Sequence, residues 1–248
     1  MEQCKIIIPA RLNSTRLPRK LLLNETGKPL LQHTYESARE SKLAGEVLIA
    51  TDSQEIFEVA TGFGAKVFMT SPTAPSGTDR ISEVAAQFEE TFCIVNVQGD
   101  EPELSGAEID KAIELLLENP TAEMATLATP IYSREDLEDP SCVKVVFGES
   151  QQALYFSRSP IPYAREWNDS FLEQPHFYQH IGLYVYRRDF LLKFSEMSPT
   201  MAEKFERLEQ LRVLEHGGTI LVATTPKRSL GIDTEADYRA FVKKYNSC

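Results

Sequence analysis

The sequence has little positive charge and no long hydrophobic run. Its 26 Lys and Arg against 37 Asp and Glu give a formal net charge of −11, whereas nucleic acids and anionic membranes are bound by clustered positive charge. No apolar stretch approaches the roughly 20 residues that span a bilayer, and no charged-then-apolar leader opens the sequence. We therefore expect a cytoplasmic protein with no nucleic-acid or membrane partner.

Cysteine is also scarce. The four cysteines stand at scattered positions, Cys4, Cys93, Cys142 and Cys248. Their spacing matches neither a disulfide framework nor a zinc site. We expect reduced thiols that act as small apolar residues or as bystanders.

Strand and helix patterns alternate over the first 120 or so residues. Short apolar runs typical of buried parallel strands lie at 6–8, 46–51, 66–69 and 92–97, and helical periodicity lies at 30–41, 52–60, 81–88 and 105–116. This alternation predicts an α/β fold whose open, mostly parallel sheet carries helices on both faces. Gly62 and Gly64 come after a helix and before a strand, so they indicate a helix end rather than a dinucleotide-binding turn.

The second half of the chain departs from this alternation. Strands are predicted at 124–130, 143–147, 153–157, 180–186 and 219–223, with one long helix over 202–216. The irregular segment 159–179 is rich in proline and aromatic residues that must be buried somewhere. We expect a single domain over 1–248 in which 159–179 is a dimerisation arm, with packing onto its own domain as the alternative.

A basic loop follows the first strand. Arg11, Arg16, Arg19 and Lys20 stand within ten residues, beside small polar side chains. Ligands of open α/β sheets gather at the carboxyl ends of the strands, and such cations can neutralise phosphate oxygens. The loop therefore favours a polyphosphate site over a solvated basic loop.

Acidic residues follow the fourth strand. Asp100 and Glu101 have no capping role, because Ser105 and Glu108 form a capping box for the next helix. A carboxylate at this position is suited to Mg²⁺, which prefers a few carboxylates and phosphate oxygens. Near the end of the chain, Asp233 either caps the last helix or supplies a second carboxylate.

Several motifs together resemble one family, the 3-deoxy-manno-octulosonate (Kdo) cytidylyltransferases, or CMP-Kdo synthetases. They are, in order, IIPARLNSTRLPRK, SGTDRI, NVQGDEP, ALYFSRSPIP, HIGLYVYRR, LEQLRVLEHG and GIDT. The match covers essentially the whole chain, and the seven motifs stand in the right order. The resemblance implies a fold like that of nucleotide-diphospho-sugar transferases. It also implies an enzyme that uses CTP, Kdo and Mg²⁺ to make CMP-Kdo for lipopolysaccharide synthesis, and the aromatic arm adds the expectation of a homodimer.

The resemblance also implies roles for individual residues. It implies that Lys20, Asp100 and Asp233 are catalytic and that the two aspartates hold the metal. It places on the nucleotide Ala10, Arg11, Ser14, Thr15, Arg16, Lys20, Ser76, Gly77 and Arg80. It places on the sugar acid Gln98, Arg158, His180, Tyr184, Glu209 and Gln210. From the residues alone, Ser76 and Gly77 fit a helix-starting turn, His180 a core histidine, and Glu209 with Gln210 a solvated helix face.

The sequence departs from the family pattern at two places. Thr73 and Ala74 stand where Asp-His is usual, and Arg19 stands where glycine is frequent. Substrate choice between Kdo and its 8-amino analogue stays open, and a sialic acid cytidylyltransferase is a further alternative. A glycosyltransferase of similar architecture and a non-catalytic nucleotide sensor are the competing classes. The sensor is disfavoured because Lys20, Asp100 and Asp233 are all present.

Overall fold

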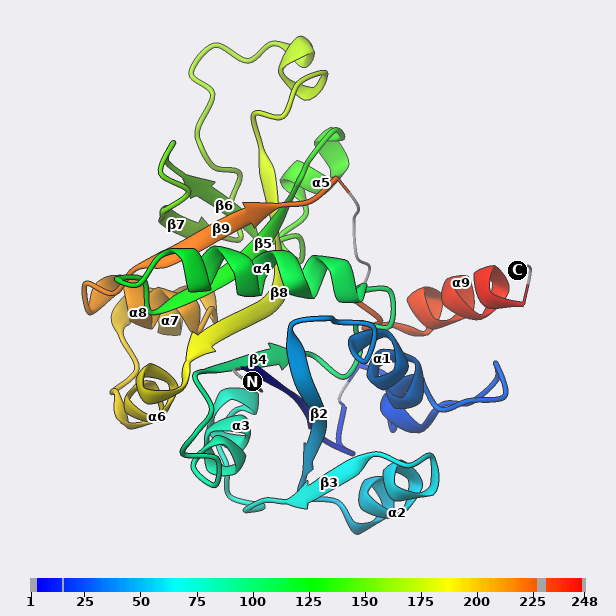
Figure 1. Cartoon of the computed structure of the whole chain (residues 1–248). Coiled ribbons are helices and arrows are strands. Elements are labelled where there is room, and N and C mark those ends of the chain that lie inside the picture. Colours follow the sequence, from blue (N-terminus) through cyan, green and yellow to red (C-terminus); the bar gives the residue numbers. More distant parts are fainter. Residues whose placement is uncertain (1–3, 15, 227–230, 247–248) are drawn as a thin grey trace. The chain divides into compact units, whose positions relative to one another are not determined.

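The structure, a computed structural model, describes residues 4–14, 16–226 and 231–246. The chain divides into two compact units (Figure 1). Unit 1 comprises 1–110, 187–195 and 229–248, and unit 2 comprises 111–186 and 196–228. The single domain expected over 1–248 stays a prediction.

Unit 1 is built on four parallel strands. They are β1 (Cys4–Ala10), β2 (Ala44–Thr51), β3 (Lys66–Met69) and β4 (Cys93–Val97). β1 pairs in parallel with both β2 and β4, and β2 pairs with β3. Every residue of β1 is buried, as expected of a strand in the middle of a parallel sheet. The predicted alternation of strands and helices is confirmed here.

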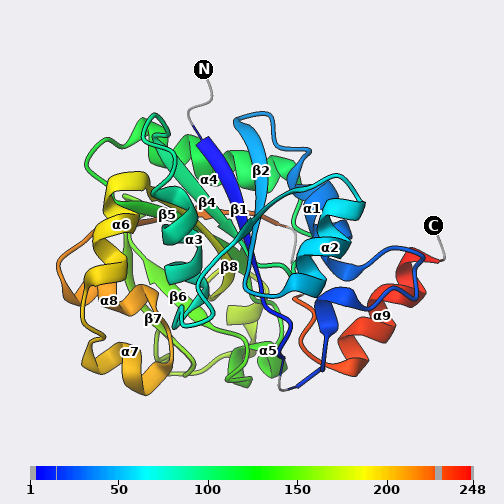
Figure 2. The same ribbon diagram turned by 90° about the horizontal axis from the view of Figure 1, so that it is seen from below.

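Helices lie on both faces of this sheet (Figure 2). α1 (Leu30–Ala38) and α2 (Gln54–Gly62) lie on one face, and α3 (Gly77–Ala85) lies on the other. Right-handed crossovers explain this, because the chain steps outward from β1 to β2 to β3 and then back to β4. The remaining helices of this unit are the short η1 (Lys20–Leu22), the start of α4 (Gly106–Glu118), α6 (Arg188–Glu196) and α9 (Glu235–Tyr245). No helix in the described part of the chain is long and apolar enough to cross a membrane.

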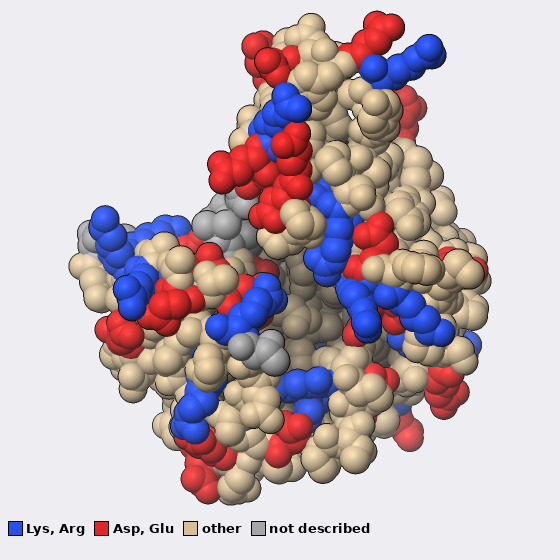
Figure 3. Space-filling model, turned by 180° about the vertical axis from the view of Figure 1, so that it is seen from behind, with Lys and Arg blue, Asp and Glu red and all other residues tan. Residues whose placement is uncertain are grey.

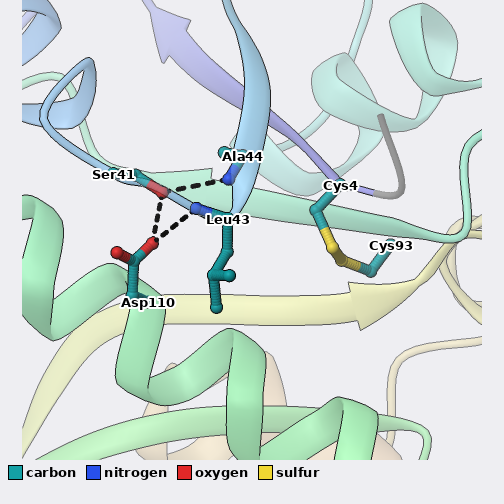
Figure 4. Close-up of a disulfide and its surroundings, with 6 residues drawn as sticks. All are labelled: Cys4, Ser41, Leu43, Ala44, Cys93 and Asp110. Carbon is teal, nitrogen blue, oxygen red and sulfur yellow. Dashed lines mark hydrogen bonds between the residues drawn. A yellow bond between two sulfur atoms is a disulfide. The ribbon is translucent and has the colours of Figure 1, made fainter. Parts of the chain in front are cut away.

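The start of α4 contacts the backbone of the loop after α1 without any intervening side chain. A Cβ added to Gly106 would lie 2.3 Å from backbone atoms of Glu40 and Ser41, so only glycine permits this approach. One turn later, the Asp110 carboxylate accepts hydrogen bonds from the Ser41 hydroxyl and from the Leu43 N–H, the latter at 3.1 Å (Figure 4). These contacts fix the loop that enters β2.

Two of the cysteines form a disulfide, so the expectation of four reduced thiols is wrong. Cys4 and Cys93 open β1 and β4, which are neighbouring strands in register, and their Cα atoms are 4.6 Å apart (Figure 4). They are 89 residues apart in sequence, so no local spacing could have indicated the pair. Cys142 is a buried free thiol, as expected, and Cys248 lies outside the described residues.

Unit 2 mixes parallel and antiparallel pairing. β5 (Met124–Pro130) pairs in parallel with β9 (Ile220–Thr224) and antiparallel with β8 (Tyr178–Arg187). β6 (Lys144–Phe147) and β7 (Ala153–Ser157) form an antiparallel pair, and α5 (Arg134–Glu138) precedes them. The strands predicted in this half of the chain are therefore confirmed to within a few residues.

The long helix predicted over 202–216 is wrong. It is two short helices, α7 (Met201–Glu206) and α8 (Gln210–Glu215). Arg207 between them has a φ of 55°, the left-handed conformation that ends helices. The break brings Glu209 and Gln210 to the beginning of α8 rather than to the middle of a helix.

The aromatic segment 159–179 packs in part onto its own unit. It contains the short helix η2 (Asp169–Leu172). Phe171 and Leu172 pack against a buried cluster that includes Phe177, which supports the alternative interpretation for these side chains. Tyr163 is 85% exposed and has no such role, so the dimerisation arm stays a prediction.

Candidate functional site

A pocket of about 390 Å³ lies at the carboxyl end of β1 in unit 1. Its volume falls within the range of about 300–1,000 Å³ that is usual for small-molecule sites. Four segments form it: the loop after β1, the start of α3, the turn after β4 and the segment before α9. The lining residues are Pro9, Arg11, Asn13, Ser14, Arg16, Lys20, Leu21, Gly77, Gln98, Gly99, Asp100 and Asp233.

Lys20 joins the two aspartates that the sequence places far apart. Its ammonium donates to the carboxylate of Asp100 and, at 2.9 Å, to that of Asp233. Burial opposes the charged form of Lys20, but the two carboxylates outweigh it and raise the pKa of the ammonium above its usual value. Lys20 therefore stays protonated, and the oxygens of both aspartates point at one place.

Backbone contacts hold the last segment of unit 1 against the turn after β4. The N–H of Ile232 donates to the carbonyl of Asp100 at 2.9 Å, and the carbonyl of Ile232 accepts from Lys20 at 3.0 Å. Thr234, not Asp233, caps α9 through a capping box with Asp237. The capping alternative for Asp233 is thus wrong, and its carboxylate is left to the pocket, where Arg16 also contacts it at 2.9 Å.

The two carboxylates fit a hard divalent cation. Both already contact one cationic nitrogen, so a single ion could be reached by both. Mg²⁺ is usually bound by one or two carboxylates, with waters and substrate phosphates completing its shell. Within the described residues, no three His, Cys, Asp or Glu converge as a metal site. An ion here would therefore depend on substrate oxygens or water for its remaining ligands.

Arg11 offers the pocket an unpaired donor. One terminal nitrogen donates to the carbonyl of Ala74 at 3.1 Å, which fixes the guanidinium against the loop before α3. Its Nε is buried and has no partner within the described residues. A buried donor without a partner is costly, so this N–H favours an acceptor supplied by a ligand. Ser14 also lines the pocket, whereas Thr15 lies outside the described residues.

Other residues expected at the nucleotide have structural partners. Ser76 caps α3 in a capping box with Asp79, so its hydroxyl is engaged, although Gly77 lines the pocket. Arg80 is fully buried and pairs with Asp52 at 2.8 Å. Ala10 is buried at the end of β1.

Arg80 belongs to a second pocket of about 440 Å³ that shares residues with the first. Arg11 and Asn13 line both. The Nε of Arg80, like that of Arg11, is buried without a partner in the described structure. The structure therefore brings Arg80 near the basic loop but not into the same pocket.

The basic side chains of this protein do not form an extended positive surface on the face shown in Figure 3. On that face they lie among acidic side chains. This matches the net charge of −11. The cluster of Arg11, Arg16 and Lys20 at one pocket therefore stands out as a specific feature.

In unit 2, Arg158 is held by backbone carbonyls. Its Nε donates to the carbonyl of Glu206 at 2.7 Å, and a terminal nitrogen donates to that of Pro140 at 3.0 Å. The Glu206 carboxylate in turn accepts from the Arg158 N–H at 2.9 Å and from the Ser157 hydroxyl at 2.6 Å. These bonds tie β7 to the break between α7 and α8.

His180 and Tyr184 lie together on β8. Their ring centroids are 5.3 Å apart. The ring of Phe156, a residue of β7, lies 5.1 Å from that of His180. Burial lowers the pKa of His180 to about 3. The ring is therefore neutral near pH 7 and brings no positive charge to an anion.

Glu209 is close enough to Tyr184 to act on its titration, and Gln210 follows it as the first residue of α8. Burial raises the pKa of Tyr184, and the nearby Tyr186 and Glu209 raise it further. Gln210 is only 3% exposed, and its Nε2 has no partner in the described structure. An unpaired buried amide is suited to a polar ligand such as a sugar hydroxyl.

Comparison with known proteins identifies the family. The family profile described as cytidylyltransferase matches residues 5–222. The chain belongs to the cytidylyltransferase family. A 3-deoxy-manno-octulosonate cytidylyltransferase of Rhodopirellula baltica is 47% identical over 99% of each chain, and one of Geobacter sulfurreducens is 48% identical over 96% of this chain and 97% of that one.

A solved structure has the same fold as this cytidylyltransferase. It is a CMP:2-keto-3-deoxy-manno-octonic acid synthetase complexed with CTP, with a TM-score of 0.92, 38% identity and coverage of 99% of both chains. The predicted fold class, an open, mostly parallel sheet with helices, is confirmed, and the sheet is mixed. The resemblance stated from the motifs is confirmed as well.

Sequence reasoning missed some residues of the cytidylyltransferase site. Leu21 and Gly99 line the first pocket but carry no chemistry that would single them out. Glu206 was missed because its role depends on a break in the helix that the periodicity did not reveal. The position of Thr126 beside His180 depends on strand pairing, and the sequence gives no signal for it.

Proposed function

We propose that this protein transfers the cytidylyl group of CTP to the anomeric 2-hydroxyl of Kdo, giving CMP-Kdo and pyrophosphate. The observation that carries the proposal is the contact of Asp100 and Asp233 with one ammonium, that of Lys20, at the mouth of β1. Family membership and the similarity to a synthetase complexed with CTP support it.

Catalysis of such a transfer is mainly positioning and the stabilisation of charge on phosphate oxygens. Arg11, Arg16 and Lys20 supply three cations at one pocket and would hold the triphosphate and the departing pyrophosphate. The backbone around Gly77, at the start of α3, is suited to the cytosine base. The Ser76 side chain is not, because its hydroxyl caps the helix.

Asp100 and Asp233 are the residues that would hold Mg²⁺. A bound ion would counter charge on the phosphate oxygens and favour ionisation of the attacking hydroxyl. Lys20 meanwhile keeps the two carboxylates side by side. It also supplies a fixed positive charge to the same pocket.

The sugar acid is assigned to side chains of unit 2. Arg158 would neutralise its carboxylate. The neutral His180, with Tyr184, Glu209 and Gln210, would contact its hydroxyls, because an uncharged ring brings no positive charge to the carboxylate. An 8-amino analogue of Kdo and sialic acid are the alternative substrates.

The cellular setting is part of the same proposal. The reaction would take place in the cytoplasm and feed lipopolysaccharide synthesis. We further propose a homodimer in which segment 159–179 contacts a second copy, supported by the exposed Tyr163. Light scattering at micromolar concentration should give twice the mass of the chain, and a monomer would contradict this.

The decisive test is a pyrophosphate-release assay with CTP and a panel of ulosonic acids, each with and without Mg²⁺. We expect release with Kdo and Mg²⁺ and none without the metal. Release only with 8-amino-Kdo or only with sialic acid would identify that acid as the substrate in place of Kdo. No release with any acid would refute the proposed activity.

Asp100→Asn tests the metal assignment. We expect turnover to fall by about 10³-fold or more, because losing a metal ligand removes stabilisation of the transition state, while the fold is unchanged. Asp189→Asn is the matched control, since this side chain is 84% exposed on α6. Turnover near that of the control would exclude the metal role.

A further inference from the structure

Strand β8 contains a bulge beside the residues assigned to the sugar acid. Thr126 of β5 pairs with Tyr184, but the next residue, Leu127, pairs with Ile181. The two β8 residues between these partners face no residue of β5. Both strands belong to unit 2, and they lie side by side in Figure 1.

The bulge explains how two aromatic rings meet on one strand. In a regular strand, residues four apart are separated by about 13 Å, at a rise of about 3.4 Å per residue. The ring centroids of His180 and Tyr184 are only 5.3 Å apart. Bulges shorten and bend a strand and are frequent where a side chain must be aimed at a ligand.

The hydroxyl of Thr126 holds this bulge. Thr126 is fully buried, and its Oγ1 lies 2.6 Å from the carbonyl oxygen of Leu183, inside the bulge, and 2.9 Å from His180 Nε2. Oγ1 also lies 3.3 Å from the carbonyl oxygen of Ile181. Carbonyl oxygens only accept, so the single hydroxyl proton is donated to these carbonyls, of which Leu183 is the closer. Thr126 Oγ1 must then accept its second bond from an N–H at His180 Nε2.

This assignment fixes the tautomer of His180. A neutral imidazole carries one proton, and the bond to Thr126 places it on Nε2. Nδ1 is then an acceptor that can receive a hydrogen bond from a hydroxyl group.

We propose that Thr126 is a positioning residue of the sugar-acid site, which pins the β8 bulge and fixes His180 as the Nε2–H tautomer so that Nδ1 accepts a substrate hydroxyl. The inference rests on the proposed function for the substrate, but the bulge and the tautomer do not.

Three variants separate this role from simple burial. Thr126→Val keeps the shape of the side chain and removes the hydroxyl, and Thr126→Ser keeps the hydroxyl. Thr129→Val is the matched control, because Thr129 is another buried threonine of β5, 2% exposed. His180→Gln identifies the His180 signals in the spectra.

The first measurement is the tautomer, from long-range ¹H–¹⁵N spectra of the ligand-free protein near pH 7. We expect the Nε2–H tautomer in wild type, in Thr126→Ser and in Thr129→Val, and loss of this preference in Thr126→Val. A wild-type His180 that is protonated, or that carries its proton on Nδ1, overturns the inference even if Thr126→Val fails to fold.

The second measurement is steady-state kinetics with CTP and Kdo. In Thr126→Val we expect the KM for Kdo to rise about tenfold, the effect of one weakened hydrogen bond, while the KM for CTP stays within about twofold. Thr126→Ser should restore the KM for Kdo. Equal KM values in folded Thr126→Val and Thr129→Val overturn the inference, whereas absence of turnover in wild type refutes only the proposed function.

Discussion

Replacing His180 with glutamine should make the protein less sensitive to acid. Burial lowers the pKa of His180 to about 3 in the folded protein, against about 6.5 in an unfolded chain. Because the folded pKa is the lower one, the unfolded state binds the proton more readily. The stability linked to neutral His180 is fully present above about pH 6.5 and is lost as the pH falls from there towards 3.

The size of the effect follows from these two values. A pH of 5 lies about 1.5 units below the pKa of the imidazole in the unfolded chain, and each unit corresponds to about 1.4 kcal/mol of unfolding free energy. Wild type should therefore lose about 2 kcal/mol of unfolding free energy between pH 7.5 and pH 5 through His180 alone. Its side chain is only 8% exposed, so solvent screening is minor.

Urea unfolding of wild type and His180→Gln at pH 5 and pH 7.5 measures this difference. The stability of His180→Gln should fall by about 2 kcal/mol less than that of wild type over this interval. His216→Gln is the control, because it removes an exposed imidazole at the end of α8. Equal pH dependence in wild type and His180→Gln would refute the reasoning.

Three further predictions concern stability and substrate affinity. Gly106→Ala should destabilise by about 2 kcal/mol or more in urea unfolding, because its Cβ would overlap the backbone of Glu40 and Ser41, just after α1; a gain of stability, which helix propensity alone predicts, would contradict this contact. Arg19 has a φ of 57°, so Arg19→Gly should be more stable than Arg19→Ala by about 1 kcal/mol in the same assay, and equal stabilities would count against that backbone conformation. Glu206→Gln should raise the KM for Kdo and not that for CTP, because the Glu206 carboxylate accepts from the main-chain N–H of Arg158 and so fixes the backbone that carries this side chain; parallel changes in both values would exclude this role.

Local patterns predicted local structure well. The strand at 66–69 and the helix end at Gly62 are where the apolar runs and glycines place them. The sequence pattern alone could not show that Asp100 and Asp233 form one metal site, because only the folded chain brings them together. From spacing alone, Asp233 was equally suited to capping α9, and the structure decides against capping because Thr234 and Asp237 form the capping box.

The features that were missed depend on tertiary structure. The apolar periodicity over 202–216 continues through Arg207, and no residue type there indicates the left-handed turn that ends α7. The disulfide between Cys4 and Cys93 depends on two strands that are adjacent only in the folded sheet. The β8 bulge is likewise a property of pairing with β5, which a single sequence does not reveal.

The placement of Asp233 has a consequence for the synthesis of the protein. A ribosome makes residues 1–110 first, yet these residues acquire the second carboxylate only when 229–248 emerge, after all of unit 2 has been translated. A nascent or prematurely terminated chain that ends before Asp233 would present the basic loop and Asp100 without their counterpart. The pocket is therefore completed only after unit 2 has been translated, and products that end before Asp233 should be inactive from the outset.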